Sequence, residues 1–169
     1  MENIVVFVGN QHPESRGYVR LASNDPFAKP LIQPNYLQSQ HDIDVLIEGV
    51  KIMNDVMKQK SVSELWDVKM DCAKYGDINT DDSALEAYIR DSIWHIYHPV
   101  GTCKMGDIEK DSMAVIDNKL KVRGIGNLRV ADASIYPHQT SGNTQSPTYM
   151  VGEKAADIIG KLESIGIKS

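Results

Sequence analysis

His98 is the residue of this chain whose setting best suits proton-transfer chemistry. Pro99 follows it and restricts the backbone to extended geometry, and Gly101 permits a turn that lets another group approach closely. An imidazole titrates near neutral pH, so it can accept a proton and release it again. In this setting a histidine has either a catalytic or a structural role, and the local sequence leaves both open.

Other arrangements of reactive residues give weaker signals. His95, His98 and Cys103 could be zinc ligands of a metal-dependent hydrolase, but residues three apart on a strand face opposite sides and a fourth ligand is missing. We therefore expect no metal site. Gly124–Gly126 lacks the third glycine of a dinucleotide fingerprint and indicates a hairpin. The sequence also contains no Gly-x-Ser-x-Gly elbow, so a serine hydrolase has no nucleophile motif.

The run Ser146-Pro147-Thr148 has the composition of a helix start, with Ser146 as N-cap. The unpaired amides and the positive dipole end of a helix N-terminus favour a nearby anion. By itself the run is more typical of an ordinary capped helix.

The elements that must position these residues are predicted by hydrophobic periodicity, which indicates an α+β fold. We expect a mainly antiparallel sheet covered by helices, in which strands between residues 4 and 37 join later strands. Helices are predicted over residues 42–58, 80–92 and 147–163. Strands are predicted at Ile4–Val8, which should be buried, at Gly17–Ala22, and within residues 114–124 and 127–137.

Composition limits the class of protein. The 169 residues are 41% hydrophobic and 24% charged, which suits a soluble globular domain. The net charge of −5 argues against nucleic-acid binding, which requires a basic face. Two cysteines are too few for a disulfide framework, so we expect a reduced, cytoplasmic setting. We find neither a signal peptide nor the roughly 20 consecutive apolar residues of a membrane span.

Three strings in order resemble the C-terminal signature of the glucose-methanol-choline (GMC) oxidoreductases. They are YHPVGTCKMG over residues 97–106, NLRVADASIYP over 127–137 and SGNTQSPTYMVGEKAADII over 141–159. Residues 14–37 resemble the opening of that family's substrate domain. The resemblance implies a substrate-binding domain over residues 1–106. It also implies a segment over residues 107–169 that returns to the FAD-binding domain and completes its Rossmann-like fold with a strand and the last helix.

The same resemblance implies roles for individual residues. His98 would be the general base that takes the hydroxyl proton of an alcohol while hydride passes to flavin N5. Asn143, 45 positions later, would hydrogen-bond the substrate oxygen and orient it. The positions that match the family's cofactor contacts are Asp132, Ala133, Asn143, Thr144, Gln145, Pro147 and Thr148.

The implied cofactor is FAD and the implied substrate a small alcohol, but the sequence lacks the glycine-rich turn that holds the FAD diphosphate. We therefore expect the N-terminal FAD-binding domain to come from a longer protein or a complementing chain. The isolated chain should neither hold FAD tightly nor oxidise alcohols, and its exposed apolar surface should favour self-association. The alternative function is a small-molecule binding module without catalysis.

Overall fold

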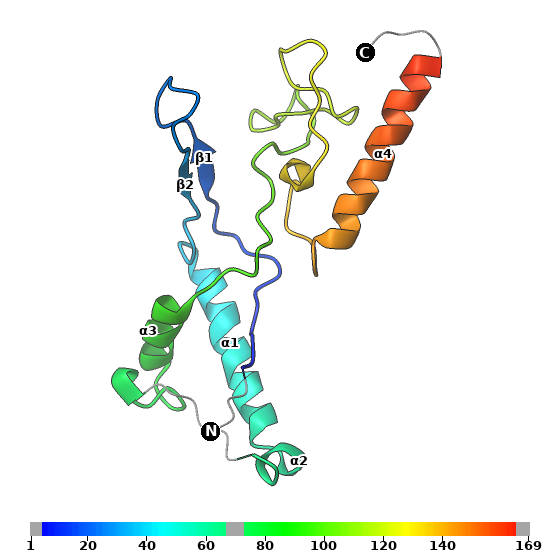
Figure 1. The fold of residues 1–169 in the computed structure, drawn as a ribbon. Helices are drawn as coiled ribbons and strands as arrows, with labels where there is room; N and C mark the ends of the chain where they lie inside the picture. The colour runs from blue at the N-terminus through cyan, green and yellow to red at the C-terminus, as the bar shows by residue number, and fades with distance from the viewer. Residues whose placement is uncertain (1–4, 67–72, 165–169) are drawn as a thin grey trace. The chain divides into compact units, whose positions relative to one another are not determined.

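The computed structural model describes residues 5–66 and 73–164, which divide into two compact units between His95 and Ile96 (Figure 1). The first unit contains a β-hairpin and three helices with one 3-10 turn. Its elements are β1 (Tyr18–Arg20), β2 (Leu31–Gln33), α1 (Gln40–Met57), α2 (Lys60–Ser63), η1 (Ala73–Tyr75) and α3 (Asp82–Ser92). The second unit contains the 3-10 turn η2 (Ala133–Ile135) and helix α4 (Gln145–Ser164).

The three predicted helices are confirmed, with ends that differ by at most two residues. Helices α1 and α3 pack against each other because the apolar stripe of each faces the other. Asp81 caps α3, since its carboxylate accepts a hydrogen bond from the Ser83 amide at 2.9 Å. The buried residues of this core are Leu37, Ile43, Leu46, Ile78, Ala84, Leu85 and Ile89.

A buried carboxylate ties the N-terminal segment to the first turn of α1. Asp42 is only 2% exposed, and it accepts hydrogen bonds from the Glu14 amide at 2.7 Å and the Ser15 amide at 2.9 Å. The Asn10 side-chain amide donates a third at 3.1 Å. Burial raises the pKa of this carboxyl, but the hydrogen bonds from Ser15 and Glu14 outweigh burial and hold the pKa below its ordinary value.

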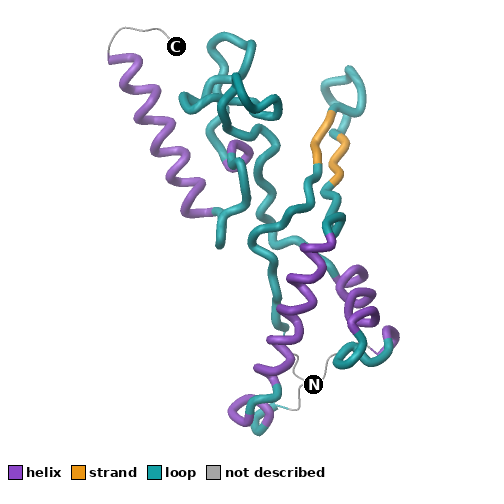
Figure 2. The backbone as a smooth tube through the Cα atoms, turned by 180° about the vertical axis from the view of Figure 1, so that it is seen from behind, coloured by secondary structure: helices purple, strands orange, loops and turns teal. Residues whose placement is uncertain are grey.

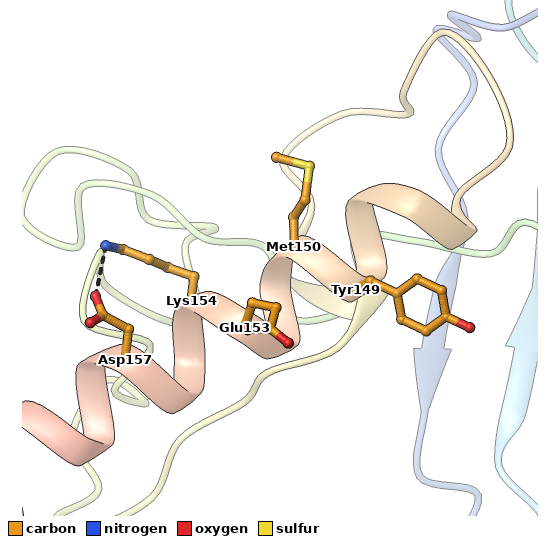
Figure 3. Close-up of a pocket in the computed structure, with 5 residues that line it drawn as sticks. All are labelled: Tyr149, Met150, Glu153, Lys154 and Asp157. Carbon is orange, nitrogen blue, oxygen red and sulfur yellow. Dashed lines mark hydrogen bonds and ion pairs between the residues drawn. The ribbon is translucent and has the colours of Figure 1, made fainter.

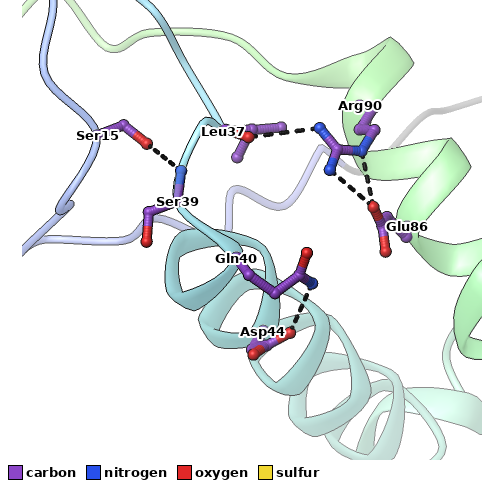
Figure 4. A network of polar contacts seen from close by, with 7 residues as sticks. All are labelled: Ser15, Leu37, Ser39, Gln40, Asp44, Glu86 and Arg90. Carbon is purple, nitrogen blue, oxygen red and sulfur yellow. Dashed lines mark hydrogen bonds and ion pairs between the residues drawn. The ribbon is translucent and has the colours of Figure 1, made fainter.

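Arg90 joins α3 to the chain that enters α1 (Figure 4). Its guanidinium pairs with Glu86 one turn earlier at 2.8 Å and also donates to the Leu37 carbonyl at 3.4 Å. At the same entry, the Ser39 amide donates to the Ser15 hydroxyl at 3.0 Å. These contacts place the start of α1 beside α3 and complete the first unit.

The predicted sheet is much smaller than expected. Within the described residues it has two short antiparallel strands, with Val19 opposite Ile32, and every residue of both strands is exposed. The prediction of a buried strand at residues 4–8 is wrong where it can be checked. Residues 5–8 form no strand, and Val5 is 70% exposed. Residue 4 lies outside the described residues. Alternation shows which positions are apolar, but a strand also needs a pairing partner.

The strands predicted within residues 114–124 and 127–137 are also wrong, and Figure 2 shows this region as loop apart from the short turn η2. Single bridges, such as Ile116 with Val122, replace continuous pairing. The Asp117 carboxylate accepts amide hydrogen bonds from residues 119 and 121, which forces a tight turn. Asp132 likewise turns the chain by capping η2. The strand that was expected to complete the FAD-binding domain is therefore a loop with isolated β-bridges in this structure.

The second unit has its own core between this loop and one face of α4. Its buried residues are Ile116, Leu120, Ile135, Tyr136 and Ala155. Val151 and Ile158 on α4 pack against this cluster. In neither described range is there a helix that is long and apolar enough to cross a membrane.

Candidate active site

His98 lies on an irregular segment whose backbone is held in an unusual conformation. Tyr97 has a φ of +61°, which residues with a side chain rarely adopt. Gly101 has a φ of +84°, and a Cβ atom there would lie 3.1 Å from the Tyr136 carbonyl oxygen. A glycine is therefore required at position 101, and the turn inferred from the sequence is confirmed.

Three backbone hydrogen bonds hold this segment against η2. The amides of Gly101, Cys103 and Met105 donate in turn to the carbonyls of residues 133, 134 and 135, at 3.3, 2.8 and 2.8 Å. Farther along, the Lys104 ammonium lies 2.7 Å from Asp111 and holds the pKa of that carboxyl below its usual range. The chain that follows His98 is thus fixed on one side by main-chain contacts.

The start of α4 supplies the other side of the site. The helix begins at Gln145, so Ser146 lies inside its first turn and is not the N-cap that the sequence predicted. Thr144 precedes the helix, and its carbonyl accepts from both the amide and the hydroxyl of Thr148, at 3.0 and 2.6 Å. Pro147 fits inside the first turn because the first amides of a helix have no intrahelical partner.

Two consecutive residues bracket the imidazole of His98. Its Nε2 lies 3.0 Å from Asn143 Oδ1, and its Nδ1 lies 3.2 Å from Thr144 Oγ1. The ring is half-buried and the Asn143 side chain is exposed. The expected proximity of His98 and Asn143 is confirmed, although 45 positions separate them in the chain. An imidazole beside an exposed amide can exchange a proton with a small hydroxyl that the amide orients.

The other residues predicted to contact a cofactor lie on the two elements that form the site. Asp132 accepts a hydrogen bond from the Ser134 amide at 2.7 Å and so caps η2, whose Ala133 carbonyl receives the Gly101 amide. Gln145 donates from its side chain to the Tyr149 hydroxyl at 3.1 Å. Thr148 points back to Thr144, as described above.

The sequence did not reveal two hydrogen bonds at this site. The Tyr136 hydroxyl lies 2.9 Å from Thr148 Oγ1 and links the buried core to the first turn of α4. Thr144 was predicted as a cofactor contact, and in the structure its hydroxyl faces His98. The spacing of Thr144 and Thr148, four residues apart, is a signal that both lie on one side of a helix start.

A separate hollow lies on the outer face of α4 (Figure 3). It is lined by Tyr149, Met150, Glu153, Lys154 and Asp157, and Lys154 pairs with Asp157 at 3.3 Å. Tyr149 and Met150 are 66% and 69% exposed. His98 does not line this hollow, and we therefore place the candidate chemistry at the imidazole rather than here.

Across residues 5–66 and 73–164, no group of three or more His, Cys, Asp or Glu side chains is arranged to hold a metal ion. The alternative set of His95, His98 and Cys103 forms no such group. The imidazole nitrogens of His98 face an amide and a hydroxyl instead.

Comparison with known proteins places this geometry in context. A family model described as GMC oxidoreductase matches residues 13–152. The chain is 44% identical to an alcohol dehydrogenase (acceptor) of Pseudomonas putida over 87% of its own length and 26% of that enzyme. It is 40% identical to an oxygen-dependent choline dehydrogenase of Sinorhizobium fredii, over 92% of its length and 28% of that enzyme.

Solved structures give the same picture. The fold resembles that of an FAD-dependent oxidoreductase from Chaetomium thermophilum with a TM-score of 0.83 and 29% identity. The match covers 91% of this chain and 26% of that one. The chain thus spans about a quarter of the length of the relatives that it matches.

Proposed function

The chain belongs to the GMC oxidoreductase family, and we propose that it is the catalytic C-terminal portion of an FAD-dependent enzyme that oxidises alcohols. The observation that carries this proposal is the distance of 3.0 Å between His98 Nε2 and Asn143 Oδ1 at the start of α4. It supports a shared binding point for one small oxygen. Because the chain spans about a quarter of its relatives, the activity belongs to an assembly with the rest of the protein.

In this proposal His98 is the general base. Its Nε2 takes the hydroxyl proton of the alcohol, and the Asn143 amide donates a hydrogen bond to the same oxygen. The carbinol carbon loses hydride with its electron pair, so the alcohol becomes a carbonyl compound and the imidazole becomes an imidazolium. FAD, when bound, supplies the hydride acceptor.

The residues at the start of α4 suit one edge of a flavin ring. The first amides of a helix have no intrahelical partner, and the positive end of the helix dipole favours the negative charge of a reduced flavin. In α4 these first amides are those of Gln145 and Ser146. Asp132, Ala133, Asn143, Thr144, Pro147 and Thr148 would complete that contact. The sequence has no glycine-rich turn for the diphosphate, so these residues fit the ring edge alone.

We further propose that residues 1–106 serve the substrate domain and that residues 107–169 return to the FAD-binding domain. The chain divides into its two compact units between His95 and Ile96, eleven residues before the proposed domain boundary. His98 and the start of α4 lie in the same compact unit, which supports a base that sits beside the flavin-contacting helix.

Complementation tests the proposal. The chain would be co-expressed with the remaining N-terminal part of the Pseudomonas putida alcohol dehydrogenase (acceptor), its 44% identical relative. We expect the pair to retain FAD and a primary alcohol to bleach the flavin absorbance without oxygen. The chain alone should do neither, because it lacks the diphosphate site.

Two outcomes would contradict the proposal. A chain that alone is yellow and active would contradict the requirement for a supplied domain. A pair that holds FAD and binds alcohols without bleaching would support the binding-module alternative.

A further inference from the structure

Thr144 contacts His98 at the ring nitrogen that does not face Asn143. Its Oγ1 is 3.2 Å from His98 Nδ1, while Asn143 Oδ1 is 3.0 Å from Nε2. We infer that Thr144 is a positioning residue whose hydroxyl orients His98 and supports it in each protonation state that the reaction requires. The inference rests on the proposed function for its catalytic meaning.

The chemistry of the hydroxyl explains why threonine suits this position. A neutral imidazole has one N–H donor and one bare acceptor nitrogen, whereas a hydroxyl can both donate and accept. With the Asn143 carbonyl oxygen facing Nε2, a neutral ring carries its hydrogen on Nε2 and accepts the Thr144 hydroxyl proton at Nδ1. The ring is then held but cannot act as a base through Nε2.

The base form needs the opposite arrangement. Nε2 must be bare to take the alcohol proton, so Nδ1 carries the hydrogen and donates it to Thr144 Oγ1. The Asn143 amide turns so that its NH₂ group faces the substrate oxygen. Once the proton has moved, the imidazolium keeps the same bond from Nδ1, now charge-assisted and stronger. One hydroxyl thus serves all three forms without movement of the ring.

The backbone of Thr144 is held in place from the buried core. Its carbonyl accepts from the Thr148 hydroxyl at 2.6 Å, and that hydroxyl has a single hydrogen, so the Tyr136 hydroxyl must donate to Thr148 at 2.9 Å. Tyr136 is only 6% exposed. The hydroxyl that faces His98 therefore sits on a β-branched residue at a fixed helix start, which restricts its rotamers.

The test compares Thr144→Val, which keeps the shape and removes the hydroxyl, with Thr144→Ser, which keeps the hydroxyl. The first readout is the pair of imidazole ¹⁵N resonances of His98 in the full 169-residue chain, which needs no flavin. We expect the Nδ1 resonance to move in Thr144→Val, more than Nε2 does, and to return in Thr144→Ser. Thr102→Val removes an exposed threonine from the same turn and should leave both resonances unchanged.

The second readout is the rate of flavin reduction by an alcohol in the complemented enzyme. Thr144→Val should lower the maximal rate about tenfold with little change in alcohol affinity, the loss expected for one hydrogen bond. Thr144→Ser should recover most of that rate.

The outcomes separate the inference from the proposed function. Unmoved ¹⁵N resonances in Thr144→Val, or a serine variant that behaves like valine, would overturn the positioning role. If the ¹⁵N resonances move in Thr144→Val but the wild-type complex never oxidises alcohols, Thr144 remains the partner of His98 and the proposed function is refuted.

Discussion

The two units each contain one conspicuous polar centre, Asp42 in the first and His98 in the second, and their partners differ in kind. Asp42 is 2% exposed and is held mainly by two main-chain amides, at 2.7 and 2.9 Å, while the Asn10 side-chain amide donates a third hydrogen bond at 3.1 Å. His98 is half-buried, and its ring nitrogens face the side chains of Asn143 and Thr144.

That difference distinguishes a centre that fastens the chain from one suited to the proton transfer that we propose for His98. Main-chain amides only donate and cannot turn, so the Asp42 carboxylate is held in one state and serves to fasten the chain. A side-chain amide can rotate and a hydroxyl can reverse its role, so the partners of His98 can follow a change in its protonation. The number of hydrogen bonds alone would not distinguish the two centres.

The largest expected effect concerns His98. His98→Ala should slow flavin reduction in the complemented enzyme by roughly 10² to 10⁴, the usual loss for a general base. FAD retention should be unchanged, because the imidazole lies beside the start of α4 and does not belong to it. Stopped-flow absorbance measures the rate, and His138→Ala, which replaces an exposed histidine, is the control. A rate equal to that of the wild type would remove His98 as base.

The second effect concerns stability through Asp42. Asp42→Asn replaces one acceptor oxygen with a donor, so a buried amide loses its partner, and we expect a loss of about 2–3 kcal/mol in the free energy of unfolding. Urea unfolding followed by tryptophan fluorescence suits this test, since Trp66 and Trp94 are the two tryptophans and both lie in the first unit. The exposed Asp44, whose carboxylate accepts a hydrogen bond from the Gln40 side chain at 3.0 Å, provides the matched control Asp44→Asn. Equal losses in both variants would contradict the comparison.

The third effect is the pH dependence of that contribution. Hydrogen bonds hold the pKa of Asp42 below its ordinary value of 3.8, even though burial opposes them. A lowered folded-state pKa contributes stability that is complete above the unfolded value and is lost as the pH falls through the folded one. The difference in the free energy of unfolding between the wild type and Asp42→Asn should therefore be constant above about pH 5 and shrink at lower pH. A difference that grew on acidification would show that the sign is wrong.

The smallest effect concerns the link between the core and α4. Tyr136→Phe removes the hydroxyl that donates to Thr148 and should cost about 1 kcal/mol, since the ring itself stays buried. Amide hydrogen exchange at Ala155 on α4 should accelerate about fivefold if exchange follows the stability of this unit. Tyr149→Phe, on the exposed face of the same helix, is the control and should leave this exchange rate unchanged.

The sequence by itself determined the helices and the candidate base. Apolar spacing is a local property, so it located α1, α3 and α4 within two residues of their ends. The string around His98 and its resemblance to one family predicted His98 as the base and Asn143 as its partner. The contact between those two residues was expected from that resemblance, and the structure supplies its distance.

Only the tertiary structure decided how distant parts of the chain pair. Strand alternation at residues 114–137 did not reveal that Asp117 and Asp132 turn the chain and leave single bridges. The bond between Thr144 and His98 joins positions 46 apart, and the three hydrogen bonds of Asp42 join it to residues up to 32 positions earlier. Such partners depend on how the loops fold against one another, and local secondary-structure propensity does not predict that arrangement.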